Sequence, residues 1–312
     1  MPRTKLLFDV DTGVDDALAL LLALGHPAAE IVGIGTVAGN VEVDQCTENS
    51  LKVLKLAGRA DIPVARGCSR PLVQPLRTAA YVHGNDGLGG AGLPASGLAP
   101  SGEHAVDQLI RLASAQPGEI TLVAVGPLTN VAVALMRQPA LPRLLKQVVV
   151  MGGAFAHPGN SSATAEFNIW VDPEAARMVF EAGFALTVVP LDATMQALLD
   201  DGHLAALGDG PKAGFVRAIT TDYMALYARR RGRRAAAMHD PLATAIALDP
   251  TLMTDAPSLP VTVETAGAWT RGMTVADRRP GARDDAPPGR ATVCLAADVP
   301  RFFDLFLSAL RA

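Results

Sequence analysis

The 312-residue sequence contains few cysteines and few aromatic side chains. Its three cysteines, Cys46, Cys68 and Cys294, are widely separated and form no CxxC pair. An odd number at this spacing excludes a disulfide framework and a cysteine-rich zinc site, and it is typical of a protein from a reducing compartment. Aromatic residues make up only 4% of the chain, which disfavours a protein that stacks the bases of single-stranded nucleic acid.

The sequence also lacks a long hydrophobic run and an excess of positive charge. Its longest apolar stretch, Ala17–Gly25, is far shorter than the roughly 20 residues that span a bilayer. The N-terminus turns acidic after a short apolar run, unlike a signal peptide. Lys and Arg number 27 against 31 Asp and Glu, a net charge of −4, so no basic field attracts nucleic acid. We expect a cytoplasmic protein that binds neither membranes nor nucleic acid.

Hydrophobic residues make up 49% of the chain and charged residues 19%, which excludes intrinsic disorder. Short runs rich in Val, Ile and Leu alternate with helical patterns. The predicted strands are Lys5–Val10, Ile31–Val37, Glu119–Val125, Gln147–Met151 and Ala185–Pro190. The predicted helices are Asp15–Leu24, Val43–Ala57, Ala105–Ser114, Leu128–Met136 and Pro173–Ala182. This alternation predicts an α/β fold with an open, mostly parallel, doubly wound (Rossmann-like) sheet flanked by helices.

No repeat or linker divides the chain, so residues 1–312 are predicted to form one domain. Function in such a fold is expected at the carboxyl ends of the strands. The Gly-, Pro- and Ser-rich segment 84–102 is long for a connector and is a candidate mobile flap. The arginine-rich run 229–234 is interpreted as an exposed helix end or loop. The segment 278–290 is predicted to be a solvated loop between two late strands.

Four carboxylates lie within eight residues at the junction between the first predicted strand and the following helix: Asp9, Asp11, Asp15 and Asp16. Acidic side chains at a helix start have a simple explanation, because they cap free N–H groups and oppose the helix dipole. Four of them would repel one another unless a cation or firm hydrogen bonds neutralise them. Oxygen donors without nearby His or Cys favour calcium or magnesium over zinc. The segment therefore predicts a cation site.

By itself, this segment also resembles the nucleophile strand of haloacid-dehalogenase-type phosphatases, which carry a DxDx(T/V) motif. Gly13 stands where that motif needs Thr or Val. No clear downstream Lys and acidic pair completes the pattern.

Further motifs follow later predicted strands or open helices. They are Gly39-Asn40, VGPLTN at 125–130, AEFNIWVDPEAA at 165–176 and HDPLA at 239–243. Together with DVDTGVDDALAL at 9–20, and in this order, they resemble the inosine–uridine preferring nucleoside hydrolase family. The resemblance covers nearly the whole chain, and its closing segment 270–277 is similar to the family's last strand pair. Several motifs in one order are far more specific than any one of them.

The resemblance implies hydrolysis of the N-glycosidic bond of ribonucleosides to ribose and free base, with one tightly held Ca²⁺. By matched motif position, the metal ligands are Asp11, Asp16, Asp240 and the main-chain carbonyl of Val125. Asp15 matches the residue that binds the ribose 2′- and 3′-hydroxyls. The positions that hold the sugar are Asn40, Asn160, Glu166 and Asn168, the last two towards its 5′ end. His83 matches the family's flap-associated histidine, which implies contact with the substrate; its alternative is an ordinary loop histidine. Relatives commonly form dimers or tetramers, so a homodimer or homotetramer is expected.

Glycoside cleavage passes through an oxocarbenium-like transition state. Asp11 is the expected general base for an attacking water, with direct displacement and inversion rather than a covalent intermediate. Imidazole titrates near neutrality, so His239 is the candidate proton donor to the leaving base; its alternative is a helix cap or a residue that supports a metal ligand.

Four apolar or aromatic residues have two readings that the sequence leaves open. Tyr223 and Tyr227 are four apart on a predicted helix and therefore share a face, where they wall the base pocket or pack in the core. Met151 and Phe167 line the cavity floor, with core packing as the rival. A protein that binds nucleosides or sugars without catalysis, and a magnesium-dependent phosphatase, are the alternative functions. Segment 229–237 lies where the resemblance places base-contacting and lid residues, but it follows no clear family pattern, so the preferred base is not readable from the sequence.

Overall fold

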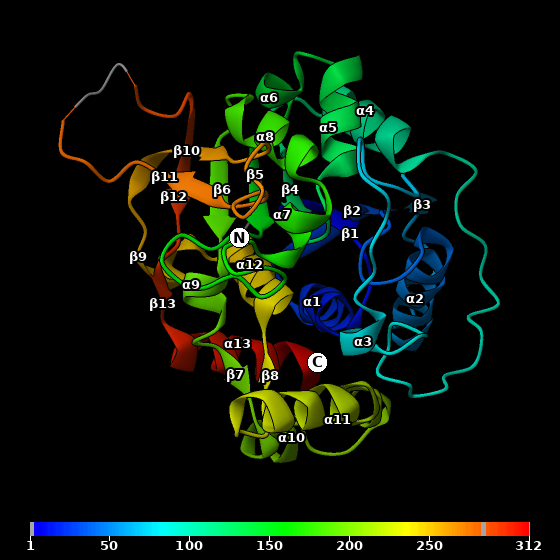
Figure 1. The fold of residues 1–312 in the computed structure, drawn as a ribbon. Coiled ribbons are helices and arrows are strands. Elements are labelled where there is room, and N and C mark those ends of the chain that lie inside the picture. The colour runs from blue at the N-terminus through cyan, green and yellow to red at the C-terminus, as the bar shows by residue number, and fades with distance from the viewer. Residues whose placement is uncertain (1–2, 282–284, 312) are drawn as a thin grey trace.

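The computed structural model describes residues 3–281 and 285–311, and it centres on a nine-stranded sheet (Figure 1). The strand order is β11-β10-β12-β6-β5-β4-β1-β2-β3. In chain order the strands of this sheet are β1 Thr4–Val10, β2 Ala29–Thr36, β3 Val64–Arg66, β4 Ile120–Ala124, β5 Gln147–Met151, β6 Leu186–Val189, β10 Ser258–Val263, β11 Thr274–Ala276 and β12 Gly289–Val293. The pairs from β3 across to β12 are parallel, and β10 pairs antiparallel with both β12 and β11. The predicted mostly parallel α/β sheet is confirmed.

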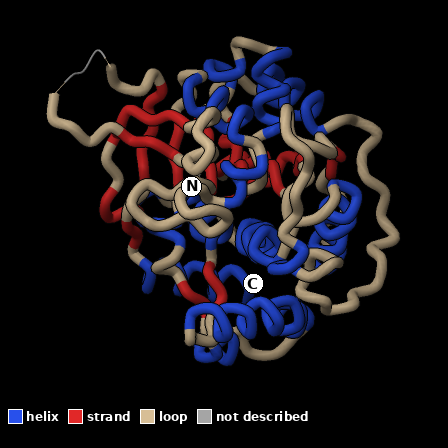
Figure 2. Tube along the Cα trace, in the orientation of Figure 1, coloured by secondary structure: helices blue, strands red, loops and turns tan. Residues whose placement is uncertain are grey.

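Helices cover both faces of the sheet (Figures 1 and 2). One face packs against α1 Val14–Gly25, α2 Val43–Leu56, α12 His239–Leu248 and α13 Val299–Arg311. The other packs against α4 Ala105–Ala115, α5 Thr129–Arg137, α6 Leu141–Leu144 and α8 Pro173–Glu181. Leu6 and Phe8 of β1 belong to the first core, and Leu7 between them belongs to the second. Because successive side chains point to opposite faces, a strand buried on both sides is apolar throughout.

A smaller helical layer lies beyond α1 and α13, at the bottom of Figure 1. It consists of α10 Asp201–Ala206 and the long α11 Pro211–Arg231, preceded and followed by the paired strands β7 Leu198–Leu199 and β8 Ala236–Ala237. The remaining short elements are α3 Ala80–His83, α7 Phe167–Val171, α9 Leu191–Thr194, the 3₁₀ helix η1 Pro250–Leu252, and the paired strands β9 Met253–Asp255 and β13 Ala296–Ala297.

The predicted helices and strands of the first 190 residues are present, with ends that differ by one or two residues. Segment 84–102 is irregular, as expected for a flap (Figure 2). Ser96 in this segment donates from its backbone N–H and its hydroxyl to Glu48 of α2, and Lys55 of α2 donates to the Ser96 carbonyl. The predicted loop 278–290 lies between β11 and β12, but its last two residues, Gly289 and Arg290, already belong to β12, and its residues 282–284 lie outside the described part of the chain.

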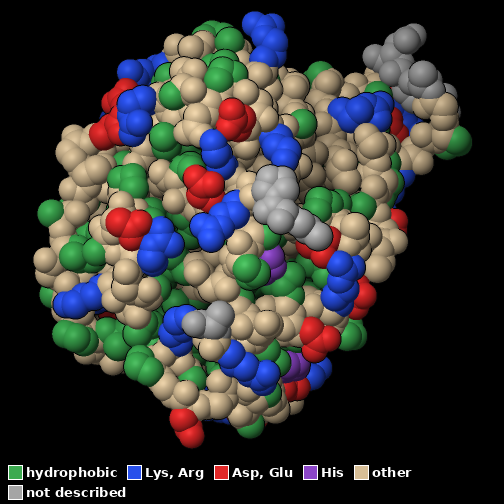
Figure 3. Space-filling view, turned by 180° about the vertical axis from the view of Figure 1, so that it is seen from behind, with side chains coloured by type: hydrophobic (Ala, Val, Ile, Leu, Met, Phe, Trp, Pro, Cys, Tyr) green, Lys and Arg blue, Asp and Glu red, His purple; other side chains and the backbone are tan. Residues whose placement is uncertain are grey.

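The arginine-rich run marks an exposed helix end, as predicted. α11 ends at Arg231, and Gly232 follows with φ of +71°, the left-handed conformation that glycine adopts most readily at a helix C-terminus. On the face drawn in Figure 3, basic and acidic side chains are interspersed. Within residues 3–281 and 285–311, none of the helices combines the length and apolar character needed to cross a bilayer.

Candidate active site

A cavity of about 330 Å³ opens at the carboxyl ends of the central parallel strands. Three lining residues lie at or just after strand ends: Val125 follows β4, Met151 ends β5, and Asp15 lies near the start of α1, which follows β1. This volume lies within the range of small-molecule sites. Of the predicted site residues, the lining contains Asp15, Asn40, His83, Val125, Met151, Asn160, Glu166, Phe167, Asn168, Tyr223, Tyr227, His239 and Asp240. Asp11 and Asp16 are buried and are not part of this lining.

The loop between β1 and α1 places its carboxylates by backbone hydrogen bonds. Asp16 accepts from the backbone N–H of Asp11 at 3.1 Å and from that of Gly13 at 2.9 Å, which satisfies donors at the start of α1. Asn40 donates its backbone N–H to Asp11 Oδ2 at 2.7 Å and its side-chain amide to Asp16 Oδ2 at 3.1 Å. The β2–α2 loop is therefore bound to both carboxylates.

Two glycines allow the backbone to approach Asp11 closely. A Cβ atom on Gly39 would lie 2.1 Å from Asp11 Oδ2, and one on Gly126 would lie 2.9 Å from Asp11 Oδ1. Only a residue without a side chain fits at Gly39, because real Cβ atoms do not approach other atoms so closely. The motifs at 39–40 and 125–130 thus provide room for the carboxylate as well as polar groups.

Asp15, Asp16 and Asp240 each offer an oxygen within 4.8 Å of the others, all from buried side chains. Burial and repulsion by neighbouring carboxylates raise the pKa of Asp11, Asp15 and Asp240 well above the usual value for aspartate. Burial also raises the pKa of Asp16, although backbone N–H donors oppose the rise. The acidic cluster Asp11, Asp15, Asp16 and Asp240 is therefore unfavourable when fully ionised without a cation.

The donors of this cluster fit a hard divalent cation. Oδ1 of Asp11 and Oδ1 of Asp15 are buried and have no hydrogen-bond partner in the described residues. Buried carboxylate oxygens are rarely left unpaired, because the unmade interaction is costly. An all-oxygen donor set favours Ca²⁺ or Mg²⁺. The three carboxylates that lie within 4.8 Å of one another include Asp15 and not Asp11. The resemblance, by contrast, makes Asp11 a metal ligand and Asp15 a sugar-binding residue. The division of roles between these two residues therefore stays a prediction.

Glu166 and Asn168 come from the start of α7. Glu166 caps this helix and accepts from the backbone N–H groups of Asn168 and Ile169, and also from Gly153. Burial raises the pKa of Glu166 to about 7 despite these donors. Asn168 donates its side-chain amide to the Val125 carbonyl at 2.7 Å. Asn168, a predicted sugar-binding residue, thus contacts the Val125 carbonyl, which is predicted to bind the metal.

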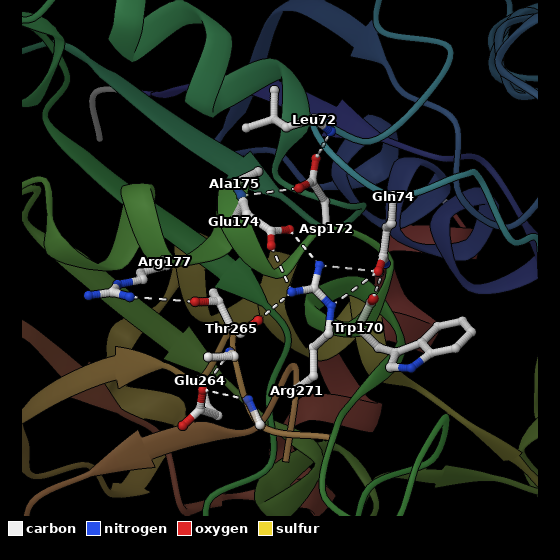
Figure 4. Close-up of polar contacts among 12 residues, drawn as sticks. Leu72, Gln74, Trp170, Asp172, Glu174, Ala175, Arg177, Glu264, Thr265 and Arg271 are labelled. Carbon is white, nitrogen blue, oxygen red and sulfur yellow. Dashed lines mark hydrogen bonds and ion pairs between the residues drawn. The ribbon is translucent and has the colours of Figure 1, made fainter. Parts of the chain in front are cut away.

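A network of ion pairs and hydrogen bonds around Arg271 contacts α7 and α8 (Figure 4). Arg271 forms an ion pair with Glu174 of α8 at 2.7 Å and donates to the side-chain oxygen of Gln74 at 3.3 Å. Gln74 in turn donates to the carbonyl of Trp170 at 2.7 Å, at the end of α7. These contacts join four parts of the chain: the hairpin between β10 and β11, the segment after β3, α7 and α8.

His83 lies against both the acidic loop and α11. Its Nδ1 accepts from the backbone N–H of Val14 at 3.2 Å, and its ring stacks on Tyr223 with centroids 5.6 Å apart. Burial lowers the pKa of His83 to about 4. The ring is therefore neutral at pH 7, and its 3.8 Å approach to Asp15 is not an ion pair.

His239 is the first residue of α12, directly before Asp240. Its Nδ1 lies 2.7 Å from the hydroxyl of Thr194, and its Nε2 lies 3.3 Å from the hydroxyl of Tyr227. Burial lowers the pKa of His239 to about 3, with smaller contributions from His83 and Arg231. The imidazole is therefore neutral at pH 7 in the metal-free site, and its role towards the leaving base stays a prediction.

The four residues for which the sequence left two interpretations open all line the cavity, and all four also contact hydrophobic clusters. Tyr223, Met151 and Phe167 line the cavity and also belong to hydrophobic clusters, whereas Tyr227 is half-buried at its wall. The sequence analysis did not name six further lining residues: Ala79, Tyr81, Val82, Gly159, Ser161 and Leu226. Arg230 and Arg231 also line the cavity, and they belong to segment 229–237, where base-contacting and lid residues were expected. The guanidinium group of Arg230 lies 5.3 Å from the ring centre of Tyr81, and that of Arg231 lies 5.8 Å from the ring centre of Tyr227.

The fold and this site define an α/β protein with a carboxylate-rich small-molecule cavity at the carboxyl edge of a parallel sheet. The chain matches the model of the inosine-uridine preferring nucleoside hydrolase family over residues 6–304, and it belongs to that family.

Individual relatives cover the chain almost completely. It is 41% identical to an inosine-uridine preferring nucleoside hydrolase of Crithidia fasciculata, over 100% of this chain and 98% of the relative. It is also 41% identical to the pyrimidine-specific ribonucleoside hydrolase RihA of Shewanella woodyi, over 98% and 97%. Among solved structures, the plant nucleoside hydrolase PpNRh1 matches with a TM-score of 0.93 at 34% identity, with 100% of both chains covered.

Proposed function

We propose that this protein hydrolyses the N-glycosidic bond of ribonucleosides to ribose and a free base, by direct attack of water on the sugar. The observation that carries the proposal is the buried acidic cluster of which Asp15 and Asp240 line a cavity of about 330 Å³. The chain's membership of a nucleoside hydrolase family supports it. As a member of that family, the protein is a ribonucleoside hydrolase.

The proposed cofactor is one Ca²⁺, held by the carboxylates of Asp11, Asp16 and Asp240 and by the main-chain carbonyl of Val125. When bound, a hard divalent cation neutralises the cluster and makes nearby water more acidic. The unpaired buried oxygens of Asp11 and Asp15 support a cation at this place. Neutralisation lowers the raised pKa values of the cluster, so that its carboxylates are ionised at neutral pH.

Asp11 is the proposed general base for the attacking water. Its Oδ2 is fixed by the backbone N–H of Asn40 at 2.7 Å, while Oδ1 is free of protein donors in the described residues. One oxygen therefore orients the carboxylate and the other is available to take a proton. In a single displacement, the water attacks the anomeric carbon from the side opposite the leaving base. The configuration at this carbon is therefore expected to invert.

The proposed sugar site uses Asp15, Asn40, Asn160, Glu166 and Asn168, all of which line the cavity. Their carboxylate and amide oxygens suit the hydroxyl groups of ribose and favour the positive charge that develops on the ring. Asp15 is proposed to bind the 2′- and 3′-hydroxyls, with Glu166 and Asn168 towards the 5′ end.

The leaving base is proposed to lie between His83, Tyr223, Tyr227 and His239. Since the pKa of His239 is lowered to about 3, the neutral imidazole assists by donating a hydrogen bond to the base as negative charge develops there. Neutral histidine acts as an electrophile of this kind in other enzymes. Met151 and Phe167, which also line the cavity, are proposed to supply apolar contacts to the substrate.

The test is incubation of the pure protein with inosine, uridine and cytidine in Ca²⁺, with release of reducing sugar as the measurement. Ribose release that EDTA abolishes and Ca²⁺ restores is the expected result. Binding of nucleosides without any release would instead support a non-catalytic binding protein. Phosphate release from phosphomonoesters, with none of these nucleosides cleaved, would support a phosphatase.

Three further properties are proposed with this function. Residues 1–312 form one domain, since a single sheet takes strands from both ends of the chain. The protein assembles as a homodimer or homotetramer, which light scattering coupled to gel filtration would test. It acts in the cytoplasm, which suits the three unpaired thiols at Cys46, Cys68 and Cys294.

A further inference from the structure

Thr194 is a buried threonine at the end of α9, and its hydroxyl lies 2.7 Å from Nδ1 of His239. The two residues are 45 positions apart in the sequence. The other ring nitrogen, Nε2, lies at the cavity beside the hydroxyl of Tyr227. The two nitrogens of His239 therefore have different surroundings: Nδ1 contacts Thr194, which does not line the cavity, and Nε2 contacts Tyr227, which does.

The direction of the buried hydrogen bond follows from the partners available. In the described part of the chain, the Thr194 hydroxyl has no hydrogen-bond partner other than His239. If Nδ1 carried a proton, it would donate to the hydroxyl oxygen, and the hydroxyl proton would be left buried without an acceptor. If the hydroxyl donates to Nδ1, every group is satisfied. The second arrangement places the imidazole proton on Nε2.

We propose that Thr194 is a positioning residue that holds His239 in the tautomer with its proton on Nε2, directed at the leaving base of the substrate. The part that concerns the leaving base rests on the proposed function. Without this hydrogen bond, the ring could carry its proton on Nδ1 and would then present a lone pair, rather than a donor, to a base that is gaining negative charge.

The backbone keeps the two residues in register. Leu198 of β7 pairs with Ala237 of β8, and the N–H of Met238 donates to the carbonyl of Ala197 at 2.9 Å. These bonds join the chain just after Thr194 to the chain just before His239. The distance between hydroxyl and ring is therefore set by paired backbone rather than by a mobile loop.

The experiment compares Thr194→Val, which removes the hydroxyl at nearly constant shape, with Thr194→Ser, which keeps it. Thr244→Val is the matched control, because the Thr244 hydroxyl is buried on α12 and has no hydrogen-bond partner in the described residues. The first measurement is the ¹⁵N NMR spectrum of histidine-labelled protein at one fixed pH, with His239 assigned by its loss in His239→Gln. The second is kcat and KM for inosine or uridine and for p-nitrophenyl riboside.

We expect His239 to be protonated on Nε2 in the wild type, in Thr194→Ser and in Thr244→Val, and to gain the Nδ1-protonated form in Thr194→Val. We expect kcat for nucleosides to fall about tenfold in Thr194→Val, the scale of one hydrogen bond, with KM and the activated substrate little changed. A wild-type ring protonated on Nδ1, or full nucleoside turnover in Thr194→Val, would overturn the proposal. If no variant or wild type cleaves nucleosides, the proposed function fails, and the NMR spectrum still decides the tautomer.

Discussion

Asn40 holds Asp11 by one oxygen only: its backbone N–H lies 2.7 Å from Oδ2, while Oδ1 has no hydrogen-bond partner in the described residues. The carboxylate is thus oriented without being saturated. A base needs both properties, because an oxygen that is fully occupied by protein donors has a lowered pKa and no free lone pair for a new proton. This asymmetry is the geometric reason for assigning proton abstraction to Asp11.

Asp11→Ala is therefore expected to lower kcat about 10³-fold on every nucleoside, the scale of general base catalysis. Fold and sugar affinity should change little, and in EDTA Asp11→Asn should melt no lower than the wild type because a repelling buried charge is removed. Steady-state kinetics and thermal melts are the measurements, with Asp44→Asn, at an exposed carboxylate, as the control. Near-full activity of Asp11→Ala would show that another group is the base.

Removal of divalent cations is expected to make stability fall as pH rises. Because the pKa values of Asp11, Asp15 and Asp240 are raised on folding, the folded state holds protons that the unfolded state has lost above about pH 4. The free energy of unfolding therefore decreases from about pH 4 upwards, and Glu166, with a pKa of about 7, contributes up to that pH.

Thermal melts between pH 4.5 and 8 in EDTA and in Ca²⁺ would measure this effect. We expect Tm to fall with pH in EDTA, and the gain from Ca²⁺ to be largest at the highest pH, where the carboxylates are most ionised. Asp11→Asn should make the EDTA curve shallower. A Tm in EDTA that rises across this range, with no gain from Ca²⁺, would contradict the cation site.

The acidic loop was predictable because its residues are local: a strand, a turn and a helix start place Asp11, Asp15 and Asp16 together through short-range backbone geometry. The cavity wall was not. Arg230 and Arg231 belong to an arginine-rich run that looks like any solvated helix end, and they line the cavity only because α11 packs near α3. No local pattern marks Thr194, whose contact with His239 depends on the pairing of β7 with β8.

His239→Ala is expected to distinguish leaving-group assistance from a structural role. Loss of the hydrogen bond from Nε2 should lower kcat/KM for inosine and uridine about 10²-fold, and for p-nitrophenyl riboside less than about tenfold, because a good leaving group needs little assistance. Kinetics on both substrate types, together with Tm, would test this. Equal losses on both would indicate that His239 acts by holding Asp240 instead.

Gly39→Ala is expected to disturb the site without removing any functional side chain. The added methyl group would lie 2.1 Å from Asp11 Oδ2, so the β2–α2 loop or the carboxylate must move, at a cost of about 1–3 kcal/mol in the free energy of unfolding. Because Asn40 is the next residue, its hydrogen bond to Asp11 should weaken and kcat should fall.

Gly214→Ala in α11 is the control, since its added methyl group meets no atom within 4 Å. There the gain in helix propensity should stabilise the protein by about 0.5–1 kcal/mol. Denaturant unfolding and nucleoside kinetics measure both variants, and a Gly39→Ala protein as stable and active as the wild type would mean that the loop is not bound tightly to Asp11.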